Sequence, residues 1–375
     1  MSFVGSARTI RVGFDARWYN DSGVGVYVAG LLQALSMRDD IELVVYEDVK
    51  NPVPGLMSAV ERIPLSAEKY SIAGQFSTKQ RCKQDGLQVF HSPFYPRPLF
   101  AACPTVVTIH DMIPFLFSIS SWPKQALVRM GYRIGARAEQ IIAVSERTAA
   151  DIQRILGIAA KRITVVHNAA DQNAFHARGN DSEVDFLTQE FGVVPPYVVV
   201  SSARNWATKN LPVALRALAL AGQQTGVRFQ TVVYGPEDGL CRAQMEGAGA
   251  GLEFRSVGYI SQADLGKLFR HAQAFVMPSL YEGFGLPVVE AMSCGCAVIT
   301  SNAGSLPEVA GDGAQTFAPA DAAGMSDALA RLLRNPNELS LWRARALKHS
   351  ADFSWSRAAK ETVSVYHRAW QRTAV

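Results

Sequence analysis

The stretch AFVMPSLYEGFGLPVVEAMSCG, residues 274–295, combines a strand, a glycine-containing loop and a helix. Its first residues are apolar throughout, as expected for a strand that is buried on both faces of a parallel sheet. Pro287 suits the first turn of a helix, and Gly295 suits its exit. Glu282 lies in the loop and Glu290 about one turn into the helix, where a core requires no carboxylates. The stretch therefore predicts a strand–loop–helix unit that carries chemistry at the carboxyl end of its strand.

The same alternation of short β-branched runs and amphipathic segments continues along the chain. Strands are expected at 10–16, 41–47, 106–111, 141–145, 163–168, 197–203, 229–235, 252–259, 274–279 and 297–302. Helices are expected at 25–35, 146–157, 211–224, 263–272, 322–334 and 354–372. This alternation predicts parallel sheets covered by helices on both faces. Because 375 residues exceed one ordinary core, we expect two doubly wound α/β domains facing each other across a cleft. A polar stretch at 176–185 is the expected boundary.

The composition is that of a globular protein, with 48% hydrophobic and 19% charged residues and a net charge of +4. Residues 1–178 carry 20 Lys and Arg against 15 Asp and Glu, an excess that does not indicate nucleic-acid binding but allows contact with an anionic surface. Five cysteines without a C-x-x-C pair predict reduced thiols rather than a disulfide frame or a zinc site. With no recognisable signal peptide or membrane span, we expect a cytoplasmic location.

The loop after residue 279 has the features of a ligand site. Gly283 and Gly285 allow the backbone to approach a ligand closely, and the helix N-terminus that follows favours a phosphate. Glu282 precedes that phosphate position, where a sugar could be held. Glu290 follows it, where a ribose could be held. We therefore expect this segment to bind a sugar attached to a nucleoside diphosphate.

Several motifs, taken together and in this order, resemble the retaining GT-B glycosyltransferases of family 4. They are S-G-x-G-x-Y at 22–27, His110-Asp111, Val144-Ser145, R-x4-K-N at 204–210, the 278–287 stretch, S-L-P-E-V at 305–309 and F-S-W at 353–355. The likeness extends over nearly the whole chain. It implies two Rossmann-like domains, with an acceptor-side domain over 1–178 and a donor-binding domain over 179–355. A final helix over 356–375 would pack back on the first domain.

The resemblance implies roles for individual residues. Arg204 and Lys209 would bind the donor diphosphate and neutralise the leaving group, a role that suits paired cations at a strand end. Glu282 would hold the sugar hydroxyls. His110 would contact the donor sugar, although a lone histidine after a strand is often structural. The other implied donor contacts are the N–H of Gly25 for the distal phosphate, Glu290 for the ribose, Val257, Gly258 and Tyr259 for the base, and Gly283, Phe284, Gly285 and Leu286 around the sugar and phosphates.

On the acceptor side, Tyr27 and Asp111 are candidate contacts, and Asp111 could instead cap the following segment. His91 and Asp15 fit structural roles. Two positions depart from the family pattern. Ala203 replaces a glycine that often precedes the phosphate arginine, and Val26 replaces a basic residue, which weakens the case for a charged acceptor phosphate.

No D-x-D motif occurs, so the resemblance implies a metal-independent enzyme without a cofactor. Arg204, Lys209 and the helix terminus would stabilise the departing diphosphate. Retention would proceed by front-face displacement. A Glu282 nucleophile is the disfavoured alternative, as in retaining hydrolases.

The motif combination resembles bacterial polysaccharide mannosyltransferases, which implies GDP-mannose as donor and a glycan or polyprenyl-linked acceptor. UDP-sugars are the alternative donors. A sugar-nucleotide-binding protein without turnover is disfavoured because Glu282, Arg204 and Lys209 are all present. An NAD-dependent dehydrogenase is disfavoured because no G-x-G-x-x-G follows the first strand.

Residues 122–138, WPKQALVRMGYRIGARA, predict a helix on which Arg129, Arg133 and Arg137 recur every four residues. In an ordinary surface helix the interleaved apolar residues would face the sheet. Alternatively, the arginine row rests on anionic lipid at the inner face of the cell membrane. The interleaved apolar residues are Trp122, Leu127, Met130, Tyr132 and Ile134.

Overall fold

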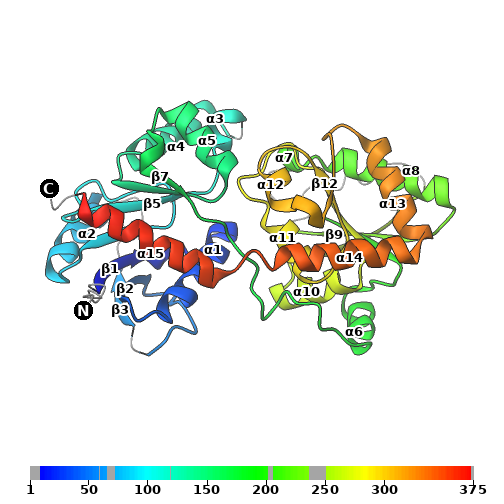
Figure 1. Cartoon of the computed structure of the whole chain (residues 1–375), viewed down its shortest axis with the longest axis horizontal. Coiled ribbons are helices and arrows are strands. Elements are labelled where there is room, and N and C mark those ends of the chain that lie inside the picture. The colour runs from blue at the N-terminus through cyan, green and yellow to red at the C-terminus, as the bar shows by residue number, and fades with distance from the viewer. Residues whose placement is uncertain are drawn as a thin grey trace, which may run out of the picture. The chain divides into compact units, whose positions relative to one another are not determined.

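The computed structural model describes residues 9–58, 60–65, 72–118, 120–201, 206–235 and 251–372. The chain forms two compact units (Figure 1). Unit 1 comprises Met1–Asn168 and Ser354–Val375, and unit 2 comprises Ala169–Phe353. The chain therefore leaves unit 1 after Asn168, forms all of unit 2 and returns at Ser354. The polar stretch at 176–185 falls inside unit 2, where α6 (Ser182–Phe191) begins.

Unit 1 contains a parallel sheet of seven described strands in the order β3-β2-β1-β4-β5-β6-β7. The strands are β1 (Ile10–Asp15), β2 (Ile41–Asp48), β3 (Glu61–Leu65), β4 (Val89–Ser92), β5 (Thr105–Ile109), β6 (Gln140–Ala143) and β7 (Ile163–Val165). The chain builds outward from β1 in one direction and then from β4 in the other. The order therefore reverses between β1 and β4, which is where open α/β sheets place ligands.

Helices cover both faces of this sheet. α1 and α15 pack together on one face, where Phe14, Leu31 and Tyr366 belong to one buried cluster. α4 and α5 contribute to the cluster on the other side, with Ile109 and Ile152. The described helices of unit 1 are η1 (Ala16–Trp18), α1 (Ser22–Ser36), α2 (Ile72–Gln84), α3 (Ile113–Leu116), α4 (Trp122–Gly135), α5 (Glu146–Leu156), η2 (Ala160–Arg162) and α15 (Trp355–Gln371).

Unit 2 repeats the arrangement with six described parallel strands in the order β10-β9-β8-β11-β12-β13. They are β8 (Tyr197–Ser201), β9 (Gln230–Tyr234), β10 (Glu253–Gly258), β11 (Ala274–Met277), β12 (Val298–Ser301) and β13 (Gln315–Phe317). The order reverses between β8 and β11. Besides α6, the described helices are α7 (Trp206–Lys209), α8 (Leu211–Thr225), α10 (Gln262–His271), α11 (Leu286–Ser293), α12 (Leu306–Ala310), η3 (Gly311–Gly313), α13 (Ala322–Arg334) and α14 (Pro336–Ser350).

The prediction of two parallel-sheet α/β domains is confirmed. Each expected strand is present, while β3, β4 and β13 were not expected. Cys82, Cys103, Cys294 and Cys296 are free thiols, and Cys241 lies outside the described residues. Within the described ranges, no helix has the length and apolar character needed to cross a bilayer.

Candidate functional site

The two strands that flank the reversal in unit 2 each lead into a charged residue of the predicted site. Lys209 ends α7, which follows β8, and Glu282 follows β11. The N–H of Leu280 donates to the carbonyl of Thr208 at 2.7 Å and so joins the two segments. Nζ of Lys209 donates to Oε1 of Glu282 at 2.7 Å, and each side chain is only 12% exposed. The sheet order thus brings together two predicted site residues that are far apart in sequence.

The backbone of Glu282 is held by the segment after β12. The hydroxyl of Ser305 donates to the carbonyl of Phe284 at 2.7 Å and to that of Glu282 at 3.1 Å. Gly304 has φ +62°, and a Cβ at this position would lie 2.7 Å from the backbone nitrogen of Glu282. Only glycine fits there without displacing Glu282. The motif at 305–309 has no role in the sequence analysis, and no local pattern singles out Gly304.

Asn210 is a second supporting residue that sequence reasoning left without a role. It adopts a left-handed conformation with φ 57° at the start of α8. Its side-chain amide donates to the carbonyls of Pro278 at 3.0 Å and Pro319 at 2.7 Å. Asn210 therefore fixes the segment that carries Lys209 against the carboxyl end of β11.

The helix after Glu282 starts as predicted. Gly285 is the N-cap of α11 with φ +96°, and Pro287 lies in the first turn. A Cβ at Gly285 would lie 2.7 Å from a side-chain methyl of Leu306, so a larger residue would not fit. The first N–H groups of an α-helix lack intrahelical partners and favour an anion.

Glu290 lies inside α11 and is buried, with 6% of its surface exposed. Burial raises the pKa of its carboxyl to about 8, and the positive charge of Lys209 acts in the opposite direction. Lys209 therefore acts electrostatically on Glu290 as well as pairing with Glu282. A largely protonated carboxyl at neutral pH can donate a hydrogen bond to a hydroxyl as well as accept one.

Other predicted donor contacts of unit 2 lie at the edge of this sheet or outside the described residues. Arg204 and Ala203 fall in the undescribed segment 202–205. Gly258 ends β10 with φ +63°, and its carbonyl accepts the N–H of Gly235 at 2.8 Å. Val257 is half-buried within β10, the edge strand next to β9, and Tyr259, directly after that strand, is exposed.

His110 follows β5 in unit 1 and is held in one tautomer. Its Nε2 lies 2.8 Å from the carbonyl of Pro93, which can only accept, so Nε2 carries the proton. Burial lowers the pKa of His110 to about 4, so the ring is neutral at pH 7. Tyr27 packs edge-on against the ring at a centroid distance of 4.8 Å. Nδ1 is therefore a hydrogen-bond acceptor.

Four further residues of unit 1 have structural partners. The side chain of Tyr27 is 1% exposed and its hydroxyl pairs with Oγ1 of Thr108 at 2.8 Å, so it is not presented as an acceptor contact. Oδ1 of Asp111 accepts the N–H of Ile113 at 2.8 Å, which is the capping alternative. His91 is fully buried between Tyr366 at 2.7 Å and Thr108 at 2.9 Å, in keeping with a structural role. Asp15 forms a buried ion pair with Arg17 at 2.7 Å.

The geometry at Gly25 differs from the expected one. Gly25 lies in the first turns of α1, and its N–H donates to the carbonyl of Asp21 at 2.8 Å. That N–H is therefore already used inside the helix. A Cβ at Gly25 would lie 2.1 Å from the carbonyl oxygen of Tyr19, so close packing explains the glycine. The N–H groups of Gly23 and Val24 precede it in the first turn, where helices lack intrahelical acceptors.

The three arginines of the predicted row differ in their contacts and exposure. Nε of Arg129 donates to the carbonyl of Pro114 at 2.7 Å, and its guanidinium lies 5.5 Å from the ring centroid of Phe115. Arg133 also lies over that ring, at 5.6 Å, and both Arg133 and Arg137 are exposed. The apolar residues of α4 divide as well. Tyr132 is buried and Ile134 half-buried, but Trp122, Leu127 and Met130 are 80%, 63% and 51% exposed.

Among the residues that the structure describes, no group of three or more His, Cys, Asp or Glu side chains is placed to hold a metal ion. The charged groups that the fold gathers at the unit 2 site are Lys209, Glu282 and Glu290. A cation, a carboxylate and a buried carboxyl beside a helix N-terminus suit a polyhydroxylated, phosphorylated ligand.

Two family models match the chain. Residues 22–174 match "Glycosyltransferase Family 4", and residues 187–349 match "Glycosyl transferases group 1". Among relatives, the O-antigen chain mannosyltransferase B of Escherichia coli is 28% identical over 321 residues, covering 83% of this chain and 82% of that protein. The MMP alpha-(1->4)-mannosyltransferase of Mycolicibacterium hassiacum is 29% identical over 286 residues, covering 72% of this chain and 67% of that protein.

Solved structures agree in fold. Sucrose-phosphate synthase from Thermosynechococcus elongatus aligns with a TM-score of 0.77 at 19% identity, covering 97% of this chain and 100% of that chain. Anabaena HepE in complex with UDP and glucose aligns with a TM-score of 0.74 at 18% identity, covering 95% and 98%. At these identities the likeness concerns the fold alone.

Proposed function

Because this chain belongs to the group 1 glycosyltransferases of family 4, we propose that it transfers a hexose from a nucleoside diphosphate sugar to a hydroxyl of a glycan or lipid-linked acceptor. The observation that carries the proposal is the Lys209–Glu282 pair at the reversal of the unit 2 sheet. In this proposal Lys209 is the cation for the diphosphate and Glu282 the carboxylate for the sugar hydroxyls, and the N-terminus of α11 that follows Glu282 supports the same assignment.

We propose mannose as the sugar and GDP as the carrier. Both relatives reported above are mannosyltransferases by name, which supports the sugar, and the base is inferred from the resemblance alone. The alternative is a UDP-sugar, because HepE was solved with UDP and glucose. Thermal shifts with GDP-mannose, UDP-glucose, UDP-galactose and the free nucleoside diphosphates separate the two. A shift with UDP-glucose and none with GDP-mannose would overturn the first choice.

In the proposed reaction, Lys209 and Arg204 neutralise the charge that develops on the departing diphosphate. The bond from the anomeric carbon to the diphosphate oxygen breaks as a bond to the acceptor oxygen forms on the same face. The acceptor proton passes to the leaving phosphate oxygen. The product keeps the anomeric configuration of the donor, and ¹H NMR of the product tests this.

The other site residues orient the donor. Glu282 accepts hydrogen bonds from sugar hydroxyls once Lys209 is shared with the diphosphate, and Glu290 pairs with a ribose hydroxyl. His110, as a neutral ring with a free Nδ1, accepts a hydroxyl of the sugar. We propose no metal and no cofactor. We also propose that the protein works as a peripheral protein at the inner face of the membrane, where a lipid-linked acceptor would be found.

Initial-rate assays test the catalytic role directly. Release of the nucleoside diphosphate that depends on acceptor supports a transferase. Donor binding with neither transfer nor donor hydrolysis would instead identify a sugar-nucleotide-binding protein without turnover.

A further inference from the structure

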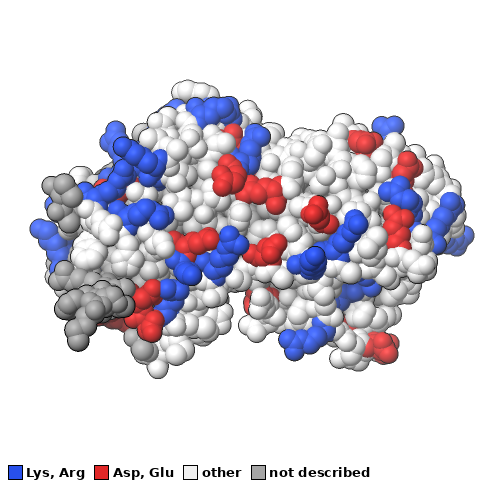
Figure 2. All heavy atoms as spheres, viewed as in Figure 1, with Lys and Arg blue, Asp and Glu red and all other residues white. Residues whose placement is uncertain are grey.

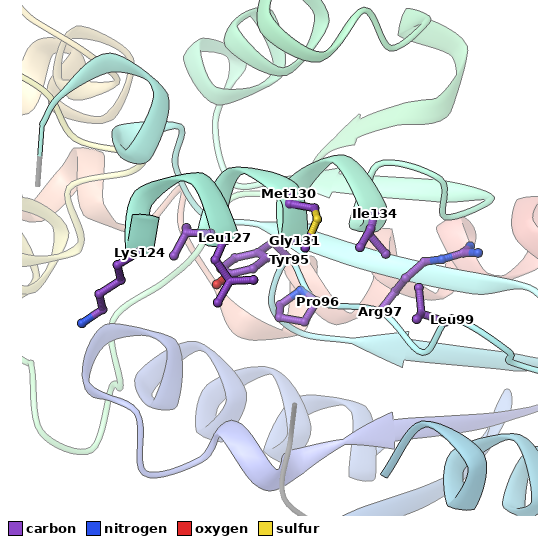
Figure 3. Close-up of a pocket in the computed structure, with 10 residues that line it drawn as sticks. Tyr95, Pro96, Arg97, Leu99, Lys124, Leu127, Met130, Gly131 and Ile134 are labelled. Carbon is purple, nitrogen blue, oxygen red and sulfur yellow. The ribbon is translucent and has the colours of Figure 1, made fainter. Parts of the chain in front are cut away.

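A pocket of about 520 Å³ opens between α4 and the segment Tyr95–Leu99 in unit 1 (Figure 3). Its volume falls within the range of small-molecule sites in proteins. The wall on α4 is formed by Leu127, Val128 and Met130 with Gly131 and Ile134, and the opposite wall by Tyr95, Pro96 and Leu99. The lining is therefore mainly apolar, and none of the residues proposed for sugar transfer belongs to it.

The position of α4 is fixed from behind, so the pocket is a formed feature of the fold. Nε2 of Gln125 donates to the carbonyls of Pro114 at 2.8 Å and Phe117 at 2.7 Å. Glycine allows the helix to approach Tyr95, because a Cβ at Gly131 would lie 2.7 Å from its ring and one at Gly135 1.9 Å from its carbonyl oxygen. These contacts hold one face of α4 against the domain and leave Leu127 and Met130 outward.

The apolar surface continues beyond the pocket. Trp122, at the first position of α4, is 80% exposed, and Leu99 and Phe100 on the facing segment are 45% and 48% exposed. Several exposed large apolar side chains around one pocket are unusual for a surface that meets only water. Their arrangement favours a ligand that is itself part of an apolar phase.

The charged residues that line the pocket, Arg97 and Lys124, are basic. Figure 3 shows Lys124 and Arg97 at opposite ends of the apolar lining. α4 contains Lys124, Arg129 and Arg133 and no Asp or Glu, and exposed Arg137 follows it. Figure 2 shows Lys and Arg side chains distributed over the part of unit 1 that carries α4 and α5. Such a rim complements anionic headgroups.

Arg97 adds a second sign of an anionic partner. It donates to Oγ1 of Thr105 at 3.2 Å and to the carbonyl of Arg137 at 3.0 Å, but its Nε is buried without a partner among the described residues. Burial, with the neighbouring charges of Arg137 and Arg162, lowers the pKa of Arg97, while Glu139 opposes this. An anion beside this guanidinium would offset the repulsion between the three arginines.

We propose that this pocket takes the hydrocarbon chain of an anionic phospholipid, while Lys124 at one end and Arg97 at the other contact the anionic headgroups of the lipid surface. The proposal rests on the membrane association proposed above and names its surface. The membrane-contacting surface is the one formed by Leu99, Leu127 and Met130 together with the basic residues Arg97 and Lys124. It is not the row of Arg129, Arg133 and Arg137. The hydrocarbon chain enters between α4 and the Tyr95–Leu99 segment. Trp122 lies beside it at the interface between membrane and water.

The first experiment measures sedimentation with vesicles of phosphatidylglycerol or phosphatidylcholine, at low and high salt. We expect binding to the anionic vesicles that weakens with salt. Lys124→Glu should weaken it roughly 20- to 30-fold, because each unit of charge near such a surface contributes about fivefold. Leu127→Glu should weaken it about tenfold or more by removing apolar contact and adding charge. Met37→Glu, a matched change at a 67% exposed site on unit 1, should have no comparable effect.

The second experiment separates the pocket from the surrounding surface. Monomeric dodecyl phosphate, below its micelle concentration, should bind in calorimetry, whereas inorganic phosphate should not. Leu99→Glu and Leu127→Glu change the two walls and should each abolish this binding. Trp122→Glu, outside the pocket, should leave it intact but weaken vesicle binding.

Three outcomes would overturn the proposal. They are equal binding to neutral and anionic vesicles, retention of both kinds of binding in Leu127→Glu, and binding only when polyprenyl phosphate is added to neutral vesicles. The last outcome would assign the pocket to the acceptor lipid. Donor hydrolysis in vesicle-free buffer is measured for every variant. Unchanged hydrolysis with lost lipid binding leaves the transferase proposal standing. Absence of both transfer and donor hydrolysis in the wild type counts against the transferase proposal alone.

Discussion

Nζ of Lys209 lies 2.7 Å from Oε1 of Glu282, although 73 residues separate them in sequence. These two charges form an ion pair with each other in a site that is largely shielded from water. In the proposed complex, the contact between Lys209 and Glu282 is replaced by two contacts. Lys209 binds the donor diphosphate, and Glu282 binds the sugar hydroxyls. The pair therefore keeps both groups satisfied and oriented until the donor arrives.

Replacing either member of this pair should abolish most of the transfer activity. We expect Lys209→Ala and Glu282→Ala each to lower the turnover number about 10²- to 10³-fold, the typical loss for one preorganised electrostatic contact. Lys267→Ala is the control, because Lys267 forms an ion pair with Asp264 on the surface helix α10. Initial rates and melting curves of the three variants are compared. Near wild-type turnover in either site variant, with unchanged melting, would refute the assignment.

Gly304 should be required for activity through its contact with Glu282. Gly304→Ala places a Cβ 2.7 Å from the backbone nitrogen of Glu282 and should shift that residue. We expect a loss of turnover of roughly tenfold or more, since small misplacements in a site are costly. Gly226→Ala is a matched control, because Gly226 has a similar φ of +68° but nothing within 4 Å of the added methyl.

Both alanine variants should lose about 1 kcal/mol of stability from the left-handed conformation. Only Gly304→Ala should lose activity. If the two variants have equal turnover and equal stability, the packing of Gly304 against the backbone of Glu282 does not contribute to activity.

The buried carboxyl of Glu290 should make stability depend on pH. Its pKa is about 8 in the folded chain and near the ordinary 4.5 when unfolded. Between these values the folded state holds a proton that the unfolded state has released. Stability should therefore fall as pH rises from about 5 to 8. Glu290→Gln should remove this part of the slope, whereas Glu190→Gln, at an exposed position of α6, should not.

Urea denaturation of the three proteins at pH 5, 6.5 and 8 measures the effect. If the free energy of unfolding changes with pH by the same amount in the wild type and in Glu290→Gln, then Glu290 is ionised in the folded state.

Transfer should not require a divalent ion. The sequence has no D-x-D motif. In the proposed mechanism, Lys209, Arg204 and the N-terminus of α11 neutralise the charge of the diphosphate. We expect the same initial rate in excess EDTA as with added Mg²⁺. A loss of turnover in chelator that Mg²⁺ restores would require metal ligands that are not among those proposed.

The sequence predicted the parts of this fold whose signal is local. The apolar runs of β8, β11 and β12 and the Gly285–Pro287 helix start are written in consecutive residues. Three strands were missed for physical reasons. β3 is a mostly exposed edge strand that contains Pro64, β4 contains His91 and Ser92, and β13 is only three residues long. None of the three has a continuous apolar run.

The site was predicted as a set of residues but not as a set of contacts. Motifs identified Lys209 and Glu282, while their pairing depends on β8 and β11 being neighbours in the sheet. The supporting roles of Gly304 and Asn210 depend on packing with segments distant in sequence, which no local pattern contains. Gly25 was expected at the start of a helix over 25–35, but α1 begins at Ser22, so the N–H of Gly25 is bonded within the helix.

The path of the chain has a consequence for biosynthesis. α15 completes the unit 1 core, where Val363 and Tyr366 are buried and Gly30 leaves room for the indole of Trp355. A ribosome makes all of unit 2 before it makes this helix. Residues 169–353 therefore have their whole sheet available while the first unit still exposes the surface that α15 will cover. During synthesis unit 2 can therefore finish folding first, whereas unit 1 cannot complete its core until α15 has left the ribosome.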